Sequence, residues 1–202
     1  MSQQTSLNKK YYFFWKRGFD VLCAILGLIL YTPLFIIVAL AIKIESQGPI
    51  LYRHVRLSKN GKPFGFYKFR TMKSDALGTT IGPSLKVESD PRITRVGRFL
   101  RKTAIDELPA LLNVLKGDMT LVGPRPALPL EIERYDQKER RRLEVKPGLT
   151  GYWQVFGREK GSFDFDEMIE MDLEYIEKCS LMLDLRILLR TIAIGLVQKA
   201  AY

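Results

Sequence analysis

The stretch that decides the fold is residues 21–42, VLCAILGLILYTPLFIIVALAI, in which 22 consecutive positions carry no charge. About 20 apolar residues suffice for a helix to cross the hydrocarbon core of a bilayer. Pro33 lies near the middle, and a proline cannot donate the backbone hydrogen bond that a helix interior requires. The hydroxyl of Thr32 can satisfy a carbonyl that the proline leaves free. We therefore expect a membrane helix with a break at Thr32 and Pro33.

Basic residues flank this stretch on both sides. Residues 1–70 contain 11 Lys or Arg and two acidic residues, and the whole chain has a net charge of +10. A spanning helix usually carries its basic residues on the cytoplasmic side only. Two basic flanks favour a re-entrant helix that enters one leaflet and leaves on the same face, and the alternative is a kinked single-pass helix. Attraction to anionic lipid explains the basic cluster better than nucleic-acid binding, because it also accounts for the adjacent apolar run.

The organisation predicted from this pattern has two parts. Residues 1–46 form an interfacial and re-entrant membrane helix, and residues 47–202 form a compact catalytic domain of the α+β class. The only histidine is His54, which excludes a zinc site with several histidines, and the two cysteines do not indicate a disulfide framework.

Several local patterns predict the elements of the second part. Residues 50–57 and 64–69 are rich in β-forming residues and flank Asn60 and Gly61, which predicts a hairpin. Leucines at helical spacing predict a helix over 106–117, with Asp106 as N-cap and Gly117 as its end. Further expectations are a loop over 73–92, a short basic helix from Gly97, a charged helix over 131–143, a glycine-rich loop over 147–161, and a helical tail over 165–197 that ends in an amphipathic helix on the membrane surface.

Three stretches have the composition of anion-binding sites. Arginine binds phosphate with two parallel hydrogen bonds, and neighbouring prolines or glycines shape the backbone around it. Arg125 lies between two prolines, and Arg158 follows a glycine. The other candidates are Lys68, Arg70 and Arg101. Any one of them alone is more often a solvated surface charge.

Asp106 and Glu107 are adjacent acids at the predicted start of a helix. The partial positive charge of a helix N-terminus keeps a carboxylate ionised. Such a carboxylate can bind Mg²⁺ or attack phosphorus as a nucleophile. The alternative is an N-cap followed by a first-turn acid without chemical function, and spacing alone favours that alternative.

Longer motifs favour a chemical role for Asp106 and Glu107 over a capping role. The chain resembles the monotopic phosphoglycosyl transferases, bacterial sugar transferases that begin the assembly of cell-surface glycans. The matching stretches are KRGFD at 16–20, GPILYRHVR at 48–56, FYKFRTM at 66–72, DPRITRVGRFLRKTAIDELPALLNVLKGDMTLVGPRP at 90–126, KPGLTGYWQVFGR at 146–158, DLEYI at 172–176 and SLMLDLRILLRTI at 180–192. Two departures are His54, where glutamine is expected, and Ala110, where glutamine is usual.

The resemblance implies an activity and a place in the cell. It implies transfer of a phosphosugar from a UDP-sugar to polyprenyl (undecaprenyl) phosphate with Mg²⁺, at the cytoplasmic face of the bacterial inner membrane. It also implies a re-entrant helix broken near a proline, which matches Pro33.

The resemblance also assigns roles to residues. Asp106 corresponds to the nucleophile that forms a covalent aspartyl-phosphosugar, and Glu107 lies beside it as a further candidate for binding Mg²⁺. The residues that correspond to the phosphate and nucleotide site are Lys68, Arg70, Arg101, Arg125 and Arg158, with Asp172 as an additional substrate-binding residue.

Two other classes of protein fit parts of the pattern. A non-catalytic membrane adaptor would use the basic stretches to hold lipid headgroups. A metal-dependent hydrolase of nucleotide sugars would release sugar phosphate without a lipid acceptor. The sugar, the glycan pathway and the oligomeric state are left open by the sequence.

Overall fold

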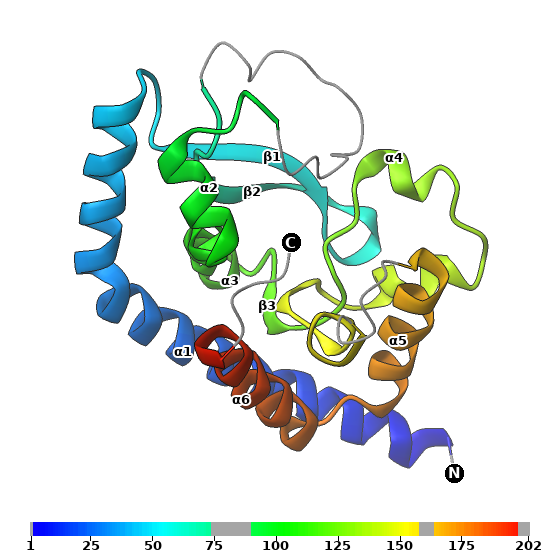
Figure 1. Ribbon diagram of the computed structural model, residues 1–202. Coiled ribbons are helices and arrows are strands. Elements are labelled where there is room, and N and C mark those ends of the chain that lie inside the picture. The colour runs from blue at the N-terminus through cyan, green and yellow to red at the C-terminus, as the bar shows by residue number, and fades with distance from the viewer. Residues whose placement is uncertain (1, 74–89, 158–163, 198–202) are drawn as a thin grey trace.

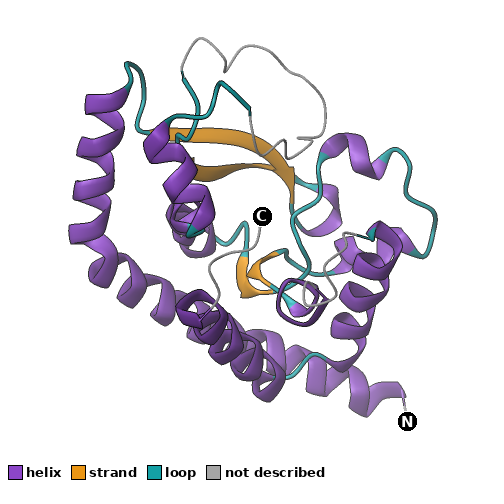
Figure 2. Ribbon diagram, in the orientation of Figure 1, coloured by secondary structure: helices purple, strands orange, loops and turns teal. Residues whose placement is uncertain are grey.

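The computed structural model describes residues 2–73, 90–157 and 164–197 (Figure 1). Most of the predicted loop over 73–92 and the whole of 158–163 lie outside the described residues. Helices surround two small pairs of strands (Figure 2), so the mixed helix and sheet composition expected of the α+β class is confirmed.

The longest element is α1, Ser2–Glu45, a helix that contains Pro33. Figure 1 shows α1 as two arms that meet at a bend. The helix continues through Pro33, so the predicted break is not seen as an interruption of the helix. The Thr32 hydroxyl donates to the carbonyl of Leu28 at 2.7 Å, a contact that bends helices. The carbonyl that a proline at 33 deprives of its donor is that of Ile29, so Thr32 bonds to its neighbour instead.

Most apolar side chains of α1 point away from the rest of the molecule. The segment from Tyr11 to Glu45 is long and apolar enough to cross a membrane. The large exposed side chains within the run are Leu22, Ile25, Leu26, Ile29, Leu30, Tyr31, Ile36, Ile37 and Leu40. Only small parts of the run are buried against the domain, at Ala24, Val38 and Ile42. An apolar surface of this extent marks a membrane or protein contact.

The predicted hairpin is confirmed. Strand β1, Leu51–Leu57, pairs antiparallel with β2, Pro63–Phe69. The connection contains a short 3-10 helix η1, Lys59–Gly61, in which Asn60 and Gly61 have φ of 58° and 72°. Asparagine and glycine are the residues that adopt this left-handed conformation most readily.

Three short helices follow. The predicted basic helix is α2, Arg95–Lys102, capped by Thr94. The helix predicted over 106–117 consists of a 3-10 helix η3, Ile105–Ala110, and α3, Leu111–Lys116. Gly117 ends α3 with φ of 85°, as predicted. The prediction that Asp106 is the N-cap is wrong, because Ala104 turns the chain with φ of 55° and Asp106 lies inside the first turn.

The region after α3 differs most from the sequence prediction. Strand β3, Thr120–Val122, pairs in parallel with β4, Gly148–Thr150, within the stretch predicted as a loop. A π-helix η5, Trp153–Gly157, follows. The single helix predicted over 131–143 is instead α4, Pro129–Ile132, and a 3-10 helix η4, Glu139–Glu144. A new helix starts there because Asp136 and Glu139 each accept a hydrogen bond from the other's backbone N–H.

The helical tail is confirmed as two helices, α5, Phe165–Lys178, and α6, Leu181–Val197. In Figure 1, α6 lies beside the N-terminal arm of α1. The large exposed apolar side chains of α6 are Leu181, Met182, Leu185, Leu189 and Ile192, whereas Ile187 is fully buried. This division between an apolar exposed side and a buried side agrees with a helix that lies on a membrane surface.

Candidate active site

The Asp106 side chain is buried between the hairpin and α2. It lies in the first turn of η3 and is 7% exposed. On the neighbouring strand β2, Lys68 donates from Nζ to Oε1 of Glu107 at 2.5 Å. Positive charge from Lys68 and Arg101 acts on the Asp106 carboxyl, together with negative charge from Glu107. The structure therefore brings together four of the predicted site residues.

The electrostatic setting of Asp106 differs from the one expected for a helix N-terminus. Burial raises the pKa of Asp106 to about 6, and Lys68 and Arg101 oppose that rise. The carboxylate is ionised at neutral pH, but it is poorly solvated and flanked by cations. A desolvated carboxylate next to positive charge is suited to attack an electrophilic phosphorus.

Arg101 is positioned by close packing between α2 and the end of the hairpin. Its Nε donates to the Thr71 hydroxyl at 2.9 Å. A Cβ at Gly97 would lie 2.1 Å from the carbonyl oxygen of Thr71. Only glycine permits this approach, so Gly97 allows the basic last turn of α2 to pack near Asp106 and Glu107.

Sequence reasoning missed two residues of β1 as site residues. Arg56 donates from Nε to Nε2 of His54 at 2.8 Å and from Nη1 to the carbonyl of Pro126 at 3.0 Å. Burial and the charge of Arg125 together lower the pKa of Arg56 to about 10, and Glu131 and Glu107 oppose this decrease. Arg56 is thus electrostatically close to both Arg125 and Glu107. The sequence signal that could have found them is the alternation of side chains along a strand, which places His54 and Arg56 on the same face of β1.

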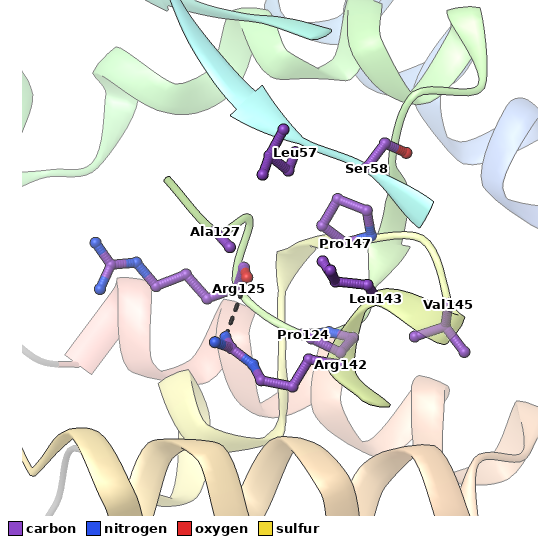
Figure 3. A pocket seen from close by; sticks show the side chains of 9 residues that line it. All are labelled: Leu57, Ser58, Pro124, Arg125, Ala127, Arg142, Leu143, Val145 and Pro147. Carbon is purple, nitrogen blue, oxygen red and sulfur yellow. Dashed lines mark hydrogen bonds between the residues drawn. The ribbon is translucent and has the colours of Figure 1, made fainter. Parts of the chain in front are cut away.

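Arg125 follows β3 in a tight turn, beside a small pocket (Figure 3). The figure shows its side chain extending away from the pocket, while its carbonyl oxygen faces the Arg142 guanidinium. Its charge acts on Arg56 across the turn. Two arginines held near each other are favourable when an anion lies between them.

Other predicted site residues have different surroundings. Arg70 is 2% exposed and donates to the carbonyls of Ser46 and Gln47, so it holds the segment that follows α1. Asp172 is fully buried and pairs with Arg142. Among the described residues, neither Arg70 nor Asp172 forms a hydrogen bond or ion pair with Asp106. Arg158 lies outside the described residues.

The carboxylates of Asp106 and Glu107 are compatible with Mg²⁺. Within residues 2–73, 90–157 and 164–197, no three His, Cys, Asp or Glu side chains form a metal-binding group. Mg²⁺ is usually held by one or two carboxylates together with substrate phosphates and water. The adjacent carboxylates of Asp106 and Glu107 would supply the protein ligands of such a set.

Comparison with known proteins finds a family and several curated relatives. The profile of the bacterial sugar transferase family matches residues 11–198. The undecaprenyl-phosphate galactose phosphotransferase of Salmonella typhimurium is 41% identical over 212 residues, which cover 98% of this chain and 44% of the relative. The UDP-glucose:undecaprenyl-phosphate glucose-1-phosphate transferase of Escherichia coli is 41% identical, with 93% of this chain and 41% of the relative covered.

A third relative is closer in length. The exopolysaccharide production protein ExoY of Sinorhizobium fredii is 40% identical over 200 residues, which cover 93% of this chain and 88% of the relative. The chain spans less than half the length of the first two relatives.

Proposed function

The chain belongs to the bacterial sugar transferase family, and we propose that it transfers a phosphosugar from a UDP-sugar to polyprenyl phosphate, releasing UMP. The observation that carries this proposal is the buried Asp106 carboxylate, which lies beside the ion pair of Lys68 and Glu107. The names of two relatives, which specify undecaprenyl phosphate and a sugar phosphate, support the same reaction.

The proposed reaction has two displacements at one phosphorus atom. A carboxylate oxygen of Asp106 attacks the β-phosphorus of the UDP-sugar, and the bond to the bridging oxygen breaks, so that UMP leaves with the electron pair. The sugar phosphate is then held as an acyl phosphate on Asp106. An oxygen of polyprenyl phosphate attacks the same phosphorus, which restores the Asp106 carboxylate and forms the lipid diphosphate sugar.

The surrounding cations stabilise the charge that develops on the transferred phosphoryl group. The charges of Lys68 and Arg101 act on Asp106, and Arg56 interacts electrostatically with both Arg125 and Glu107. Asp106 and Glu107 would hold Mg²⁺, which, when bound, supplies positive charge to the diphosphate.

We also propose that α1 is re-entrant and that the protein is monotopic, with its site on the cytoplasmic face. The support comes from contacts at both ends of the apolar run. At its start, Asp20 accepts hydrogen bonds from the Thr120 hydroxyl at 2.5 Å and the Leu121 N–H at 3.1 Å. At its end, Glu45 accepts from the backbone N–H groups of α2 at 2.6 and 2.9 Å. Both ends bond to the same folded unit, which supports a helix that enters and leaves on the same side of a bilayer.

The test is a screen of UDP-sugars with the purified protein and undecaprenyl phosphate in nanodiscs, with UMP release as the readout. Lipid-dependent release with one sugar, together with a stoichiometric burst of UMP when lipid is omitted, is the expected result. A membrane adaptor would release no UMP from any sugar. A hydrolase would turn over continuously without lipid and produce free sugar phosphate.

A further inference from the structure

The turn that carries Arg125 is held by its carbonyl groups. Four successive carbonyls accept hydrogen bonds from three different elements, β1, η4 and β4. The donors are Gly148 N to Pro124 at 2.8 Å, Arg142 Nη2 to Arg125 at 3.2 Å, Arg56 Nη1 to Pro126 at 3.0 Å, and Leu57 N to Ala127 at 3.0 Å. Two of these donors are buried or half-buried arginine side chains, which is a costly way to hold a turn unless its geometry matters.

The Arg142 guanidinium is fixed in orientation by its other contacts. Arg142 lies on η4 and is 4% exposed. Its Nε and Nη2 donate to Oδ2 of Asp172 at 3.0 and 2.6 Å, and its Nη1 donates to the Tyr135 hydroxyl at 2.6 Å. The planar fork of an arginine can serve three acceptors at once, which the single ammonium of a lysine cannot do in the same geometry.

Asp172 reaches Arg142 from α5 and is fully buried. A buried ion pair is weak support for stability, because apolar side chains of similar volume often stabilise as well. The role of this pair therefore depends on its neighbours. Arg142 donates to the carbonyl of Arg125, and the backbone of Arg125 also interacts with the Asp172 carboxyl.

We propose that Asp172 and Arg142 are positioning residues for Arg125. Asp172 orients the Arg142 guanidinium, Arg142 holds the carbonyl of Arg125, and the Arg125 side chain is thereby kept extended beside Arg56. This assignment replaces direct substrate binding by Asp172. It rests on the proposed function in so far as Arg125 and Arg56 receive the diphosphate of the donor between them.

The first test measures the turn itself, independently of activity. Arg142→Lys keeps the charge but loses the fork, so amide hydrogen exchange over residues 123–127 should become at least tenfold faster. The matched control is Arg141→Lys, because Arg141 pairs with the exposed Glu177 and should leave this exchange unchanged. Should Arg142→Lys fail to fold, Tyr135→Phe removes one acceptor of Arg142 with little change of volume and should also speed the exchange. Exchange at the wild-type rate in the folded variant overturns the proposal.

The second test is a double-mutant cycle on the lipid-dependent release of UMP. Arg142→Lys should lower kcat/KM about tenfold in the wild-type background and less than twofold in the Arg125→Ala background, since its effect passes through Arg125. Equal losses in both backgrounds would overturn the positioning role. If the wild-type protein releases no UMP from any UDP-sugar, the proposed function fails, and the exchange experiment still decides whether Asp172 and Arg142 hold the turn.

Discussion

Asp106 combines burial with ionisation, which makes its substitution informative. Asp106→Asn preserves size, and we expect turnover to fall to background because an amide is not a competent nucleophile. Burial raises the pKa of Asp106 to about 6, so the folded state is penalised for the ionised form above that pH. The variant should therefore be at least as stable as the wild type at pH 8, by up to about 3 kcal/mol at 1.36 kcal/mol per pKa unit. Thermal unfolding and UMP release measure the two effects.

The control for this variant is Asp164→Asn. Asp164 caps α5 by accepting from the N–H of Asp166, and asparagine caps equally well, so activity and stability should stay near wild type. The proposed reaction predicts that the wild-type protein with UDP-sugar and no lipid carries a phosphosugar on Asp106, detectable by mass spectrometry. Robust turnover by the Asp106→Asn protein would rule out the covalent intermediate.

The burial of His54 should make the folded protein less stable at acidic pH. Burial, together with Arg56 and Lys68, lowers the pKa of His54 to about 3, whereas the unfolded chain has an ordinary value near 6.5. The unfolded state therefore binds more protons below pH 6.5, and the stability falls as the pH falls. The contribution of His54 at pH 5 is a loss of about 2 kcal/mol relative to pH 7.5.

His54→Gln should remove this contribution. Its side-chain carbonyl can still accept from Nε of Arg56, and glutamine does not titrate. The difference in melting temperature between pH 7.5 and pH 5 should be smaller for His54→Gln than for the wild type. An unchanged difference would mean that His54 is protonated in the folded protein.

The path of helix α1 through the bilayer determines the membrane topology of the protein. A cysteine can be placed on each side of the apolar run at Gly18, where a Cβ meets nothing within 4 Å, and at the exposed Lys62. In a background without Cys23 and Cys179, an impermeant thiol reagent should label both positions only when the cytoplasmic face is open. Cysteine at Leu30, which is 72% exposed in the absence of lipid, should be protected by the bilayer. Labelling of Gly18→Cys and Lys62→Cys from opposite sides would establish a spanning helix.

At the scale of the whole molecule, a buried polar cluster joins α1 to α5 and α6. Lys16 donates to Oδ2 of Asp184 at 2.6 Å, and Tyr12 and Tyr175 donate to the same carboxylate at 2.9 and 2.7 Å. Lys16 and Asp184 are 5% and 2% exposed. The cluster therefore attaches the two helices with exposed apolar surfaces to each other and to the core.

Lys16→Met should destabilise the protein by about 3–5 kcal/mol, because it leaves the buried Asp184 carboxylate without its cation. Lys178→Ala is the control, since Lys178 pairs with Glu174 on the surface and such pairs contribute about 1 kcal/mol or less. Thermal unfolding in detergent measures both. Equal melting temperatures for the two variants would show that the Asp184 carboxylate finds another partner.

Local signals predicted what depends on neighbouring residues. The apolar run, the hairpin around Asn60 and Gly61, the end of a helix at Gly117 and the amphipathic tail follow from composition and spacing over a few residues, and the structure confirms each as an element. The motifs also led to the correct family, because long matching stretches that occur in the same order can be recognised without knowing the fold.

Which charged side chains come into contact depends on packing between segments that are distant in the sequence. The pairing of β3 with β4 joins residues 28 positions apart through three-residue strands, too short for any periodicity to show. Arg70 and Asp172 are residue types that often bind ligands. In the folded protein, however, Arg70 donates to the carbonyls of Ser46 and Gln47 after α1, and Asp172 pairs with Arg142. Local sequence is thus enough for the family, for a long apolar helix and for the expectation that Asp106 reacts. Burial and distance depend on the whole fold, and they raise the pKa of the Asp106 carboxyl and bring the charges of Lys68 and Arg101 to act on it.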